Sequence, residues 1–243
     1  IVNGVATFNI TKDIEGKYTV NATLSDPKYA NKTVETVYYV TRNDTPMNIT
    51  VLNDTLIYVG DVVKVVVSVP SDATGNITIE IDGKTYTNET INGNATFYIT
   101  DLIHGDKSVY ATYEGNNKYV SNSTTANFTV NKRQSSVNVT VDAGAVGDDV
   151  VINVTIPANA TGYVIVNVDG MNYTVNTTNG NGFLVLKDLG NGTHKVNVTY
   201  IGDDQYLPSE NSTSFDIERT NTTITIAVES IDYGQKANIT VTV

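Results

Sequence analysis

Apolar and polar residues alternate along most of this chain with a period of two. Residues 63–69 carry valine at every odd position, and residues 76–81 carry isoleucine at every odd position between polar neighbours. Residues 150–156 and 164–168 keep the same apolar phase. This alternation is typical of β-strands with one buried face, and no useful stretch follows the 3.6-residue period of a helix. The pattern therefore predicts an all-β protein.

Turn signals lie between these runs. Asp82-Gly83 and Asn92-Gly93 occupy positions where a two-residue hairpin needs positive φ at both turn residues. The predicted strands are 47–52, 62–69, 76–81, 84–91, 94–99, 107–114 and 124–131. Seven strands at this spacing predict an immunoglobulin-like antiparallel β-sandwich. Its core is expected to contain Val65, Ile79, Phe97, Val109, Tyr113 and Phe128, and in the next repeat Ile152, Val166, Leu184, Val196, Tyr200 and Phe215.

The whole pattern recurs after 87 residues. Pro70, Gly75, Tyr86, Leu102, Tyr119 and Phe128 return as Pro157, Gly162, Tyr173, Leu189, Tyr206 and Phe215. A repeat of this length is one small domain, because solenoid units are shorter. The sequence thus predicts tandem sandwiches of about 87 residues each, two complete and two partial.

The repeat assigns four pieces to the chain. We expect the C-terminal part of a repeat at 1–43, complete repeats at 44–132 and 133–219, and the N-terminal part of a repeat at 220–243. Neither partial piece contains the counterpart of residues 70–89. The 243 residues are therefore expected to be a section of a longer array.

Composition excludes several classes of protein. The chain has no cysteine, so neither disulfide bonds nor thiolate metal sites contribute. No apolar run is long enough to cross a membrane, so no membrane insertion is expected of this section. With a formal net charge of −11 and no basic cluster, the chain is a poor ligand for nucleic acid.

The sequence offers little material for catalysis. His104 and His194 occupy non-equivalent positions of the repeat, so neither is predicted to be catalytic or a ligand. Loop acids such as Asp203-Asp204 could supply oxygen ligands to calcium. They align with Asn116-Asn117, however, so solvated loops are favoured over a calcium site. We expect no catalytic residue, no cofactor and no metal.

Both complete repeats keep a Tyr-x-Gly-x-x-x-Tyr segment, from Tyr113 to Tyr119 and from Tyr200 to Tyr206. Exposed tyrosines could stack on sugars. We favour a packing role, in which the ring closes the edge of the sandwich and the hydroxyl donates to the backbone.

The three arginines, Arg42, Arg133 and Arg219, each follow the last strand of a repeat. One interpretation is that basic residues merely mark solvated linkers. The other is that the planar, five-donor guanidinium bonds carbonyls or carboxylates of the next domain and stiffens the junction. We predict that each arginine contacts the domain that follows it.

Asn-x-Ser/Thr triplets are unusually frequent. They occur 21 times among 29 asparagines, whereas the reversed triplet occurs 11 times. Strand faces rich in Asn and Thr would produce both directions equally, so the surplus favours N-glycosylation acceptors on outward faces. The candidates are Asn153, Asn138, Asn197, Asn211, Asn31, Asn122, Asn127 and Asn76. Asn31, Asn122 and Asn211 all fall at the start of a repeat's last strand.

Several segments resemble a known family. They are Pro-Ala-Asn-Ala-Thr-Gly at 157–162, Val-Asp-Gly at 168–170, Asp-Leu-Gly-Asn-Gly-Thr-His-Lys-Val at 188–196 and Val-Thr-Tyr-Ile-Gly-Asp-Asp-Gln-Tyr at 198–206. The chain is similar to the tandem bacterial Ig-like (group 3) repeats of adhesin-like surface proteins from methanogenic archaea. The first partial piece departs from the motif at residues 25–28, where the Gly-Asp-Asp loop is lost. The resemblance implies an extracellular, cell-wall-associated array and supplies no catalytic residues.

These observations predict a non-enzymatic structural and adhesive protein of the cell surface, a glycosylated rod or filament of Ig-like domains. Its partners would be other copies of the repeat, and the cell wall or other cells through parts outside these residues. The alternative is that the Ig-like modules themselves bind glycans or partner-cell surfaces. A binding module should keep an exposed aromatic or acidic cluster at one place in every repeat.

Overall fold

The structure is a computed structural model that describes residues 3–52 and 56–243. Its regular elements are 19 β-strands, and within the described residues no helix could span a membrane. The predicted all-β class is confirmed. The chain divides into two compact units, one ending at residue 131 and the other beginning at residue 132. One glycosylation triplet, at Asn53, lies outside the described residues.

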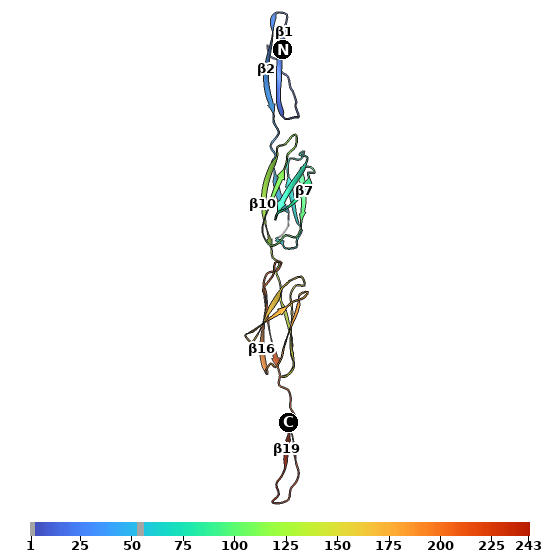
Figure 1. The fold of residues 1–243 in the computed structure, drawn as a ribbon, viewed down its shortest axis with the longest axis vertical. Coiled ribbons are helices and arrows are strands. Elements are labelled where there is room, and N and C mark those ends of the chain that lie inside the picture. Colours follow the sequence, from blue (N-terminus) through green and yellow to red (C-terminus); the bar gives the residue numbers. More distant parts are fainter. Residues whose placement is uncertain (1–2, 53–55) are drawn as a thin grey trace. The chain divides into compact units, whose positions relative to one another are not determined.

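The first unit contains a complete sandwich (Figure 1). One sheet has the order β3-β5-β8, with β3 at Asn48–Leu52, β5 at Val63–Ser68 and β8 at Asn94–Ile99. The other has the order β4-β10-β9-β6-β7, with β4 at Ile57–Tyr58, β10 at Asn122–Asn131, β9 at Gly105–Tyr113, β6 at Asn76–Ile81 and β7 at Lys84–Glu89. The predicted strands are therefore present, within a few residues of their expected bounds.

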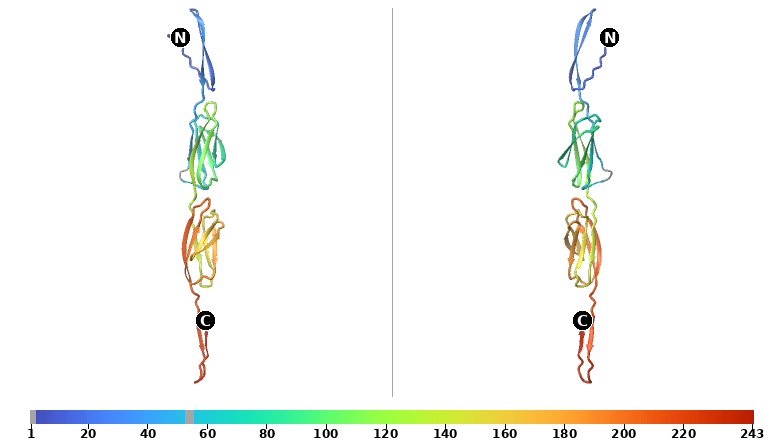
Figure 2. Two further views of the ribbon diagram at one scale, coloured as in Figure 1. Left: turned by 60° about the vertical axis from the view of Figure 1, so that its left-hand side comes forward. Right: turned by 90° about the vertical axis from the view of Figure 1, so that its right-hand side faces the viewer.

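The second unit repeats this sandwich (Figure 2). Its three-stranded sheet is β11-β12-β15, with β11 at Asn138–Asp142, β12 at Val150–Thr155 and β15 at Asn181–Leu186. Its four-stranded sheet is β14-β13-β16-β17, with β14 at Met171–Asn176, β13 at Tyr163–Val168, β16 at Gly192–Tyr200 and β17 at Ser209–Ile217.

Each unit also contains one antiparallel hairpin outside its sandwich. The first pairs β1 (Gly16–Asp26) with β2 (Tyr29–Val40), and the second pairs β18 (Thr225–Val228) with β19 (Ile239–Thr242). The alignment of the repeat makes them equivalent to the last two and the first two long strands of a sandwich. Most of their side chains are exposed.

The alternating positions form the core in the predicted register. Val65 and Ile79 are fully buried, whereas their neighbours Lys64 and Thr78 remain partly exposed. Phe97, Val109, Tyr113, Ile152, Val166, Val196 and Tyr200 are buried as predicted. Complete removal of each aliphatic side chain from water contributes about 1.5–3 kcal/mol, so this alternation supplies most of the driving force for the fold.

Three of the predicted core residues are only partly buried. Phe128, Leu184 and Phe215 pack against the core without being enclosed by it. Leu184 and Phe215 lie on the edge strands β15 and β17, and Phe128 lies on β10, which the short β4 covers only at its end. A strand with one neighbour leaves part of its inward side chains open to solvent.

The pattern of apolar and polar residues did not predict β4, which pairs in parallel with the end of β10. An equivalent parallel bridge joins Ala145 to Glu218 in the second repeat. A segment of two residues has no detectable period, and only its packing, with Ile57 buried, reveals it. Isolated parallel bridges also join Asn43 to Tyr119 and Arg133 to Tyr206, and the other named strands pair antiparallel.

The hairpin turns have the predicted geometry. Asp82-Gly83 has φ values of 48° and 73°, and Asn92-Gly93 has 51° and 74°. Their counterparts Asp169-Gly170 and Asn179-Gly180 are also positive at both residues. Positive φ at both positions matches the right-handed twist of the flanking strands.

The period is not uniform within a repeat. The equivalent strands β5 and β12 of the two repeats begin 87 residues apart, at Val63 and Val150. The equivalent strands β3 and β11 begin 90 residues apart, at Asn48 and Asn138. The first repeat therefore has three more residues between its first two long strands. This difference changes which residues are equivalent at the start of each sandwich.

Candidate functional site

The first tyrosine of the conserved segment is a buried structural residue in both repeats. Tyr113 and Tyr200 are fully buried, and their hydroxyls donate to the carbonyl oxygens of Thr74 at 2.7 Å and Thr161 at 3.1 Å. Burial raises the pKa of both phenols above its ordinary value. The predicted packing role is therefore confirmed for these two residues.

The second tyrosine is also buried but has a different acceptor from the one expected. Tyr119 donates to Asp72 Oδ1 at 2.7 Å, and Tyr206 donates to Asn159 Oδ1 at 2.6 Å. The hydroxyl therefore bonds a side chain instead of the backbone. Neither ring is available to stack on a sugar, because both are less than one-tenth exposed.

The acidic Gly-Asp-Asp loop has a structural explanation. Asp203 Oδ1 accepts from the backbone N–H of Gln205 at 2.8 Å and of Tyr206 at 2.7 Å. Asn116 Oδ1 accepts from the equivalent N–H groups of the first repeat at 2.8 and 2.9 Å. An amide oxygen and a carboxylate oxygen perform the same task here, which is why the number of acids changes between repeats.

Two acids of another loop, Asp148 and Asp149, also bond locally. Asp148 Oδ2 accepts from the N–H of Ala145 at 2.8 Å, and Asp149 forms an ion pair with Lys187 at 3.0 Å. Among the described residues, no group of three or more His, Cys, Asp or Glu side chains is placed to hold a metal ion. The arrangement offers turn-forming oxygens, and the acids do not converge on one point.

The two histidines lie in different environments. His104 is exposed. His194 is largely buried: its Nδ1 is 2.6 Å from Asp169 Oδ2, its Nε2 is 2.9 Å from the carbonyl oxygen of Gly190, and its ring stacks on Phe215. Both nitrogens face acceptors, which favours the doubly protonated ring.

Charge reinforces this network. Hydrogen bonding to Asp169, then to the Gly190 carbonyl, raises the pKa of His194. The N–H of Lys195, then the His194 ring, lowers the pKa of Asp169. At the equivalent position of the first repeat, Lys107 Nζ is buried 2.8 Å from Asp82 Oδ2. A cation thus fastens the same turn in both repeats.

We expect the second repeat to lose stability as the pH rises through the folded-state pKa of His194, which lies above its ordinary value of about 6.5. A raised folded-state pKa means that the imidazolium contributes fully below its ordinary pKa of about 6.5, and that the contribution is lost as the pH rises through the raised value. Calorimetric unfolding at a series of pH values should show a falling melting temperature for this repeat.

The matched variant is His194→Lys, which copies Lys107 of the first repeat and keeps its charge across this range. It should remove most of the fall in melting temperature. If His194→Lys retains the wild-type profile, another group is responsible for the pH dependence.

All eight candidate glycosylation asparagines are exposed. Two of them have structural bonds: Asn122 Nδ2 donates to the carbonyl of Thr45 at 2.6 Å, and Asn211 Nδ2 donates to that of Val137 at 2.8 Å. These bonds tie the start of the last strand to the start of the first. They account for the recurrence of asparagine at this position without any reference to sugar.

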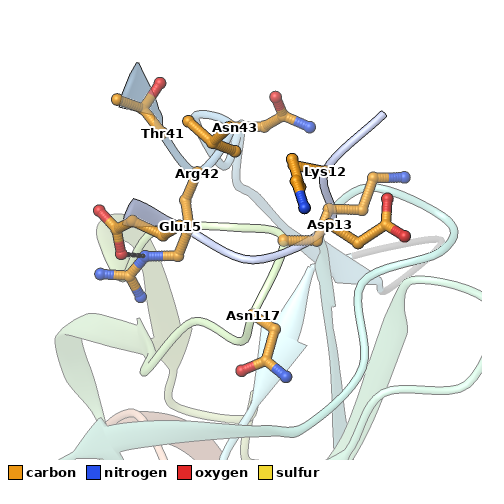
Figure 3. A pocket seen from close by; sticks show the side chains of 9 residues that line it. Lys12, Asp13, Glu15, Thr41, Arg42, Asn43 and Asn117 are labelled. Carbon is orange, nitrogen blue, oxygen red and sulfur yellow. Dashed lines mark ion pairs between the residues drawn. The ribbon is translucent and has the colours of Figure 1, made fainter. Parts of the chain in front are cut away.

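Arg42 lies beside the first sandwich (Figure 3). Its Nε is 3.0 Å from Glu15 Oε2, and its guanidinium donates to the carbonyl oxygen of Asn116 at 3.5 Å. Arg42 and Glu15 border a cavity of about 440 Å³, which also has Asn117 in its lining. Arg42 therefore contacts Asn116 of the first sandwich.

Arg133 is not the structural counterpart of Arg42. Its backbone N–H donates to Gln205 at 2.7 Å, and its carbonyl accepts from Leu207 at 2.8 Å. Asn43 makes the equivalent backbone bonds, to Lys118 and Val120.

The counterpart of Arg42 is Lys132, which the sequence analysis overlooked. Its Nζ donates to the carbonyl of Asp203 at 2.5 Å, as Arg42 donates to Asn116. Alignment by structural position, with any basic residue accepted in place of arginine, would have found it. By the same alignment Arg219 corresponds to Lys132. The Arg219 side chain is exposed, and the contact of Arg219 with the residues that follow it stays a prediction.

Comparison with solved structures found proteins of modular architecture. A tetra-tandem repeat from the extending region of a large adhesion protein aligns with a TM-score of 0.40 and 18% identity, over 94% of this chain and 70% of that chain. A 1.5-MDa bacterial ice-binding adhesin aligns with a TM-score of 0.34 and 16% identity, over 84% and 75%. Fibronectin(III)-like modules of CbhA from Clostridium thermocellum align with a TM-score of 0.31 and 14% identity, over 71% and 95%.

The comparison with curated proteins found no match. A family model does match the first sandwich, from the second residue of β3 to the end of β10. The model is that of the bacterial Ig-like domain (group 3), and it matches residues 49–131.

Proposed function

We propose that this chain is part of a non-enzymatic, glycosylated stalk or filament at a cell surface, in which Ig-like sandwiches act as spacer units of an adhesin. The supporting observation is the kind of residue that the two repeats share. Most of the shared residues form cores, turns and internal hydrogen bonds, whereas several outward-facing residues differ.

Individual positions support this contrast. Tyr113 and Tyr200 make the same buried hydrogen bond, and Asn116 and Asp203 stabilise the same turn. On the outward faces, by contrast, Val66 of the first repeat is replaced by Asn153 of the second. A module that carried one ligand site per repeat would be expected to preserve some outward-facing cluster.

Glycosylation is part of the same proposal. The candidate asparagines are exposed, and for those on an outward face, such as Asn138, Asn153 and Asn197, the triplet threonine shares that face, because side chains two residues apart point the same way. A glycan on such a face leaves the core undisturbed. Asn122 and Asn211 lie instead on the inward side of their strands, opposite the buried Tyr113 and Val198. An origin among the surface proteins of methanogenic archaea is proposed on the sequence resemblance.

Surface location can be tested in cells of the native source. Antibodies raised against residues 44–219 should label intact cells, and brief treatment of intact cells with protease should remove the label. A cytoplasmic protein probed in parallel controls for leakage. Labelling that requires permeabilisation of the cells would overturn the proposed location.

Intact-mass measurement of the protein from its native source tests the glycan coat. We expect a mass above that of the polypeptide, reduced to the polypeptide mass by chemical deglycosylation. A native mass equal to that of the bare chain would remove glycosylation from the proposal and leave the spacer role in place.

A further inference from the structure

We propose that a glycan attached to Asn153 lies on the exposed ring of Phe183 and covers the open edge of the second sandwich. This inference rests on the glycosylation in the proposed function. It goes further by assigning one acceptor, the aromatic residue that receives the first sugar, and the surface that the glycan protects.

The register of two neighbouring strands brings the two residues together. Asn153 on β12 is directly opposite Phe183 on β15. Directly opposed residues share a face of the sheet and have Cβ atoms about 4.5–5.5 Å apart. Phe183 is 67% exposed, and Asn153 and its triplet partner Thr155 are exposed as well. A sugar linked to Asn153 Nδ2 therefore begins beside an uncovered aromatic face.

The core does not obstruct this modification. Ile152 and Val154, on either side of Asn153, are fully buried on the opposite face of β12. In the part of the chain that the structure describes, no hydrogen bond occupies the Asn153 side chain. Asn211, by contrast, already uses its Nδ2 to bond the carbonyl of Val137.

The two repeats differ at both positions together. In the first repeat the opposed pair is Val66 and Thr96, so the acceptor and the aromatic ring are both missing. Phe183 is therefore not part of the packing that the two repeats share. The aromatic ring is present in the repeat that has the asparagine at this position and missing from the repeat that lacks it. Stacking of a sugar's C–H face on the ring gives this pairing a physical purpose.

A second acceptor on the same sandwich has a similar neighbour. Asn176 on β14 is directly opposite Tyr163 on β13, and both side chains are exposed. The first repeat has Glu89 opposite Asn76 at this place. The second repeat thus has two triplet asparagines, each facing an exposed aromatic ring.

A groove extends from this site. It has a volume of about 530 Å³ and is lined by Asn153, Thr155, Asn176, Thr178, Asn181 and Phe183 among others. This volume is typical of small-molecule sites. The lining consists of amides, hydroxyls and apolar groups without a charged side chain, which suits the hydroxyls and the apolar faces of neutral sugars.

The groove lies where two sheet edges meet. β14 and β15 are terminal strands of their sheets, and they are neighbours across the sandwich. An exposed edge can pair with another chain, and proteins often prevent this with charged residues. Here the residues of the two edge strands β14 and β15 are neutral, and Phe183 on β15 is apolar. A bulky glycan would therefore take the place of charge as the barrier to edge pairing.

The attachment requires a lipid-linked oligosaccharide phosphate as donor and a transferase that recognises Asn-x-Thr. The Asn153 nitrogen forms a bond to the anomeric carbon of the first sugar. The bond from that carbon to the phosphate oxygen breaks, the lipid phosphate leaves with the electron pair, and one amide proton passes to a base of the transferase.

The experiment uses the chain produced in its native, glycosylating source. Site-resolved glycopeptide mass spectrometry should find sugar on Asn153. NMR should then show the protons of its first sugar shifted upfield by the ring of Phe183. In Phe183→Thr, which copies Thr96 of the first repeat, the upfield shift should be lost, together with the increase in melting temperature that the glycan gives.

Tyr98→Thr is the matched control. Tyr98 is an exposed aromatic residue on β8, and the residue directly opposite it is Lys64, which is not a glycan acceptor. It should leave the sugar signals unchanged. Sugar on other asparagines with Asn153 bare would overturn this inference and leave the proposed coat intact. Sugar on Asn153 with identical shifts in Phe183→Thr would overturn the aromatic contact.

Discussion

Replacement of Gly93 by alanine is expected to destabilise the first sandwich by roughly 4 kcal/mol, among the largest effects of single substitutions. Gly93 has a φ of 74°, and a Cβ there would lie 2.6 Å from the carbonyl oxygen of Val69 and 2.7 Å from that of Pro70. Its own carbonyl accepts from the N–H of Val69 at 2.8 Å. The backbone cannot move away without breaking that bond.

Gly83→Ala provides the matched control. Gly83 has nearly the same φ, 73°, but a Cβ there would meet no atom within 4 Å. It should cost only the left-handed backbone penalty of about 1–2 kcal/mol. Calorimetry should show Gly93→Ala lowering the melting temperature of the first repeat by roughly 15–30 °C, and Gly83→Ala by much less.

Gly180→Ala should reproduce the effect in the second repeat, because a Cβ there would lie 2.4 Å from the carbonyl oxygen of Ile156. It should leave the transition of the first repeat unchanged. Equal losses in Gly93→Ala and Gly83→Ala would show that close backbone approach is not what requires glycine at position 93.

Tyr113→Ala is expected to destabilise the first sandwich by about 3–5 kcal/mol, as for other large aromatic side chains removed from a core. Tyr113 is fully buried, and its ring packs beneath the loop that contains Gly75, where Cε2 lies 3.7 Å from the position of a Cβ. Most of the loss comes from the cavity that the missing ring leaves.

Tyr113→Phe separates the ring from its hydroxyl. It removes only the bond to the Thr74 carbonyl, which also accepts from Asn116 Nδ2 at 3.3 Å, so we expect a loss of about 1 kcal/mol. Tyr110→Ala, on the exposed face of the same strand, should change stability by less than about 0.5–1 kcal/mol. Denaturant unfolding measures all three. A loss in Tyr113→Phe as large as in Tyr113→Ala would place the stabilisation in the hydrogen bond instead of the packing.

The sequence by itself was sufficient for features that depend on local chemistry. The alternation around Val65 and Ile79 determines which face of each strand is apolar, and only one register buries that face. Asp82-Gly83 and Asn92-Gly93 adopt positive φ because these residue types tolerate it. The strands, the hairpins and the repeat follow from these local preferences.

Tertiary structure decided the features that depend on residues far apart in the chain. The hydroxyl of Tyr119 donates to Asp72 because loops from different strands approach each other. For the same reason Lys132 makes in the second repeat the carbonyl contact that Arg42 makes in the first. The incomplete burial of Phe128 depends on how much of β10 the short β4 covers.

The candidate site shows the same division. A triplet marks Asn153 as a candidate acceptor, and the period of two turns it outward, so both properties can be read from neighbouring residues. Its position opposite Phe183, thirty residues away, depends on the register between β12 and β15. That register follows from the packing of the two inward faces, which no local pattern specifies. The sequence therefore identified the candidate acceptor, and only the assembled sheet gave it an aromatic neighbour.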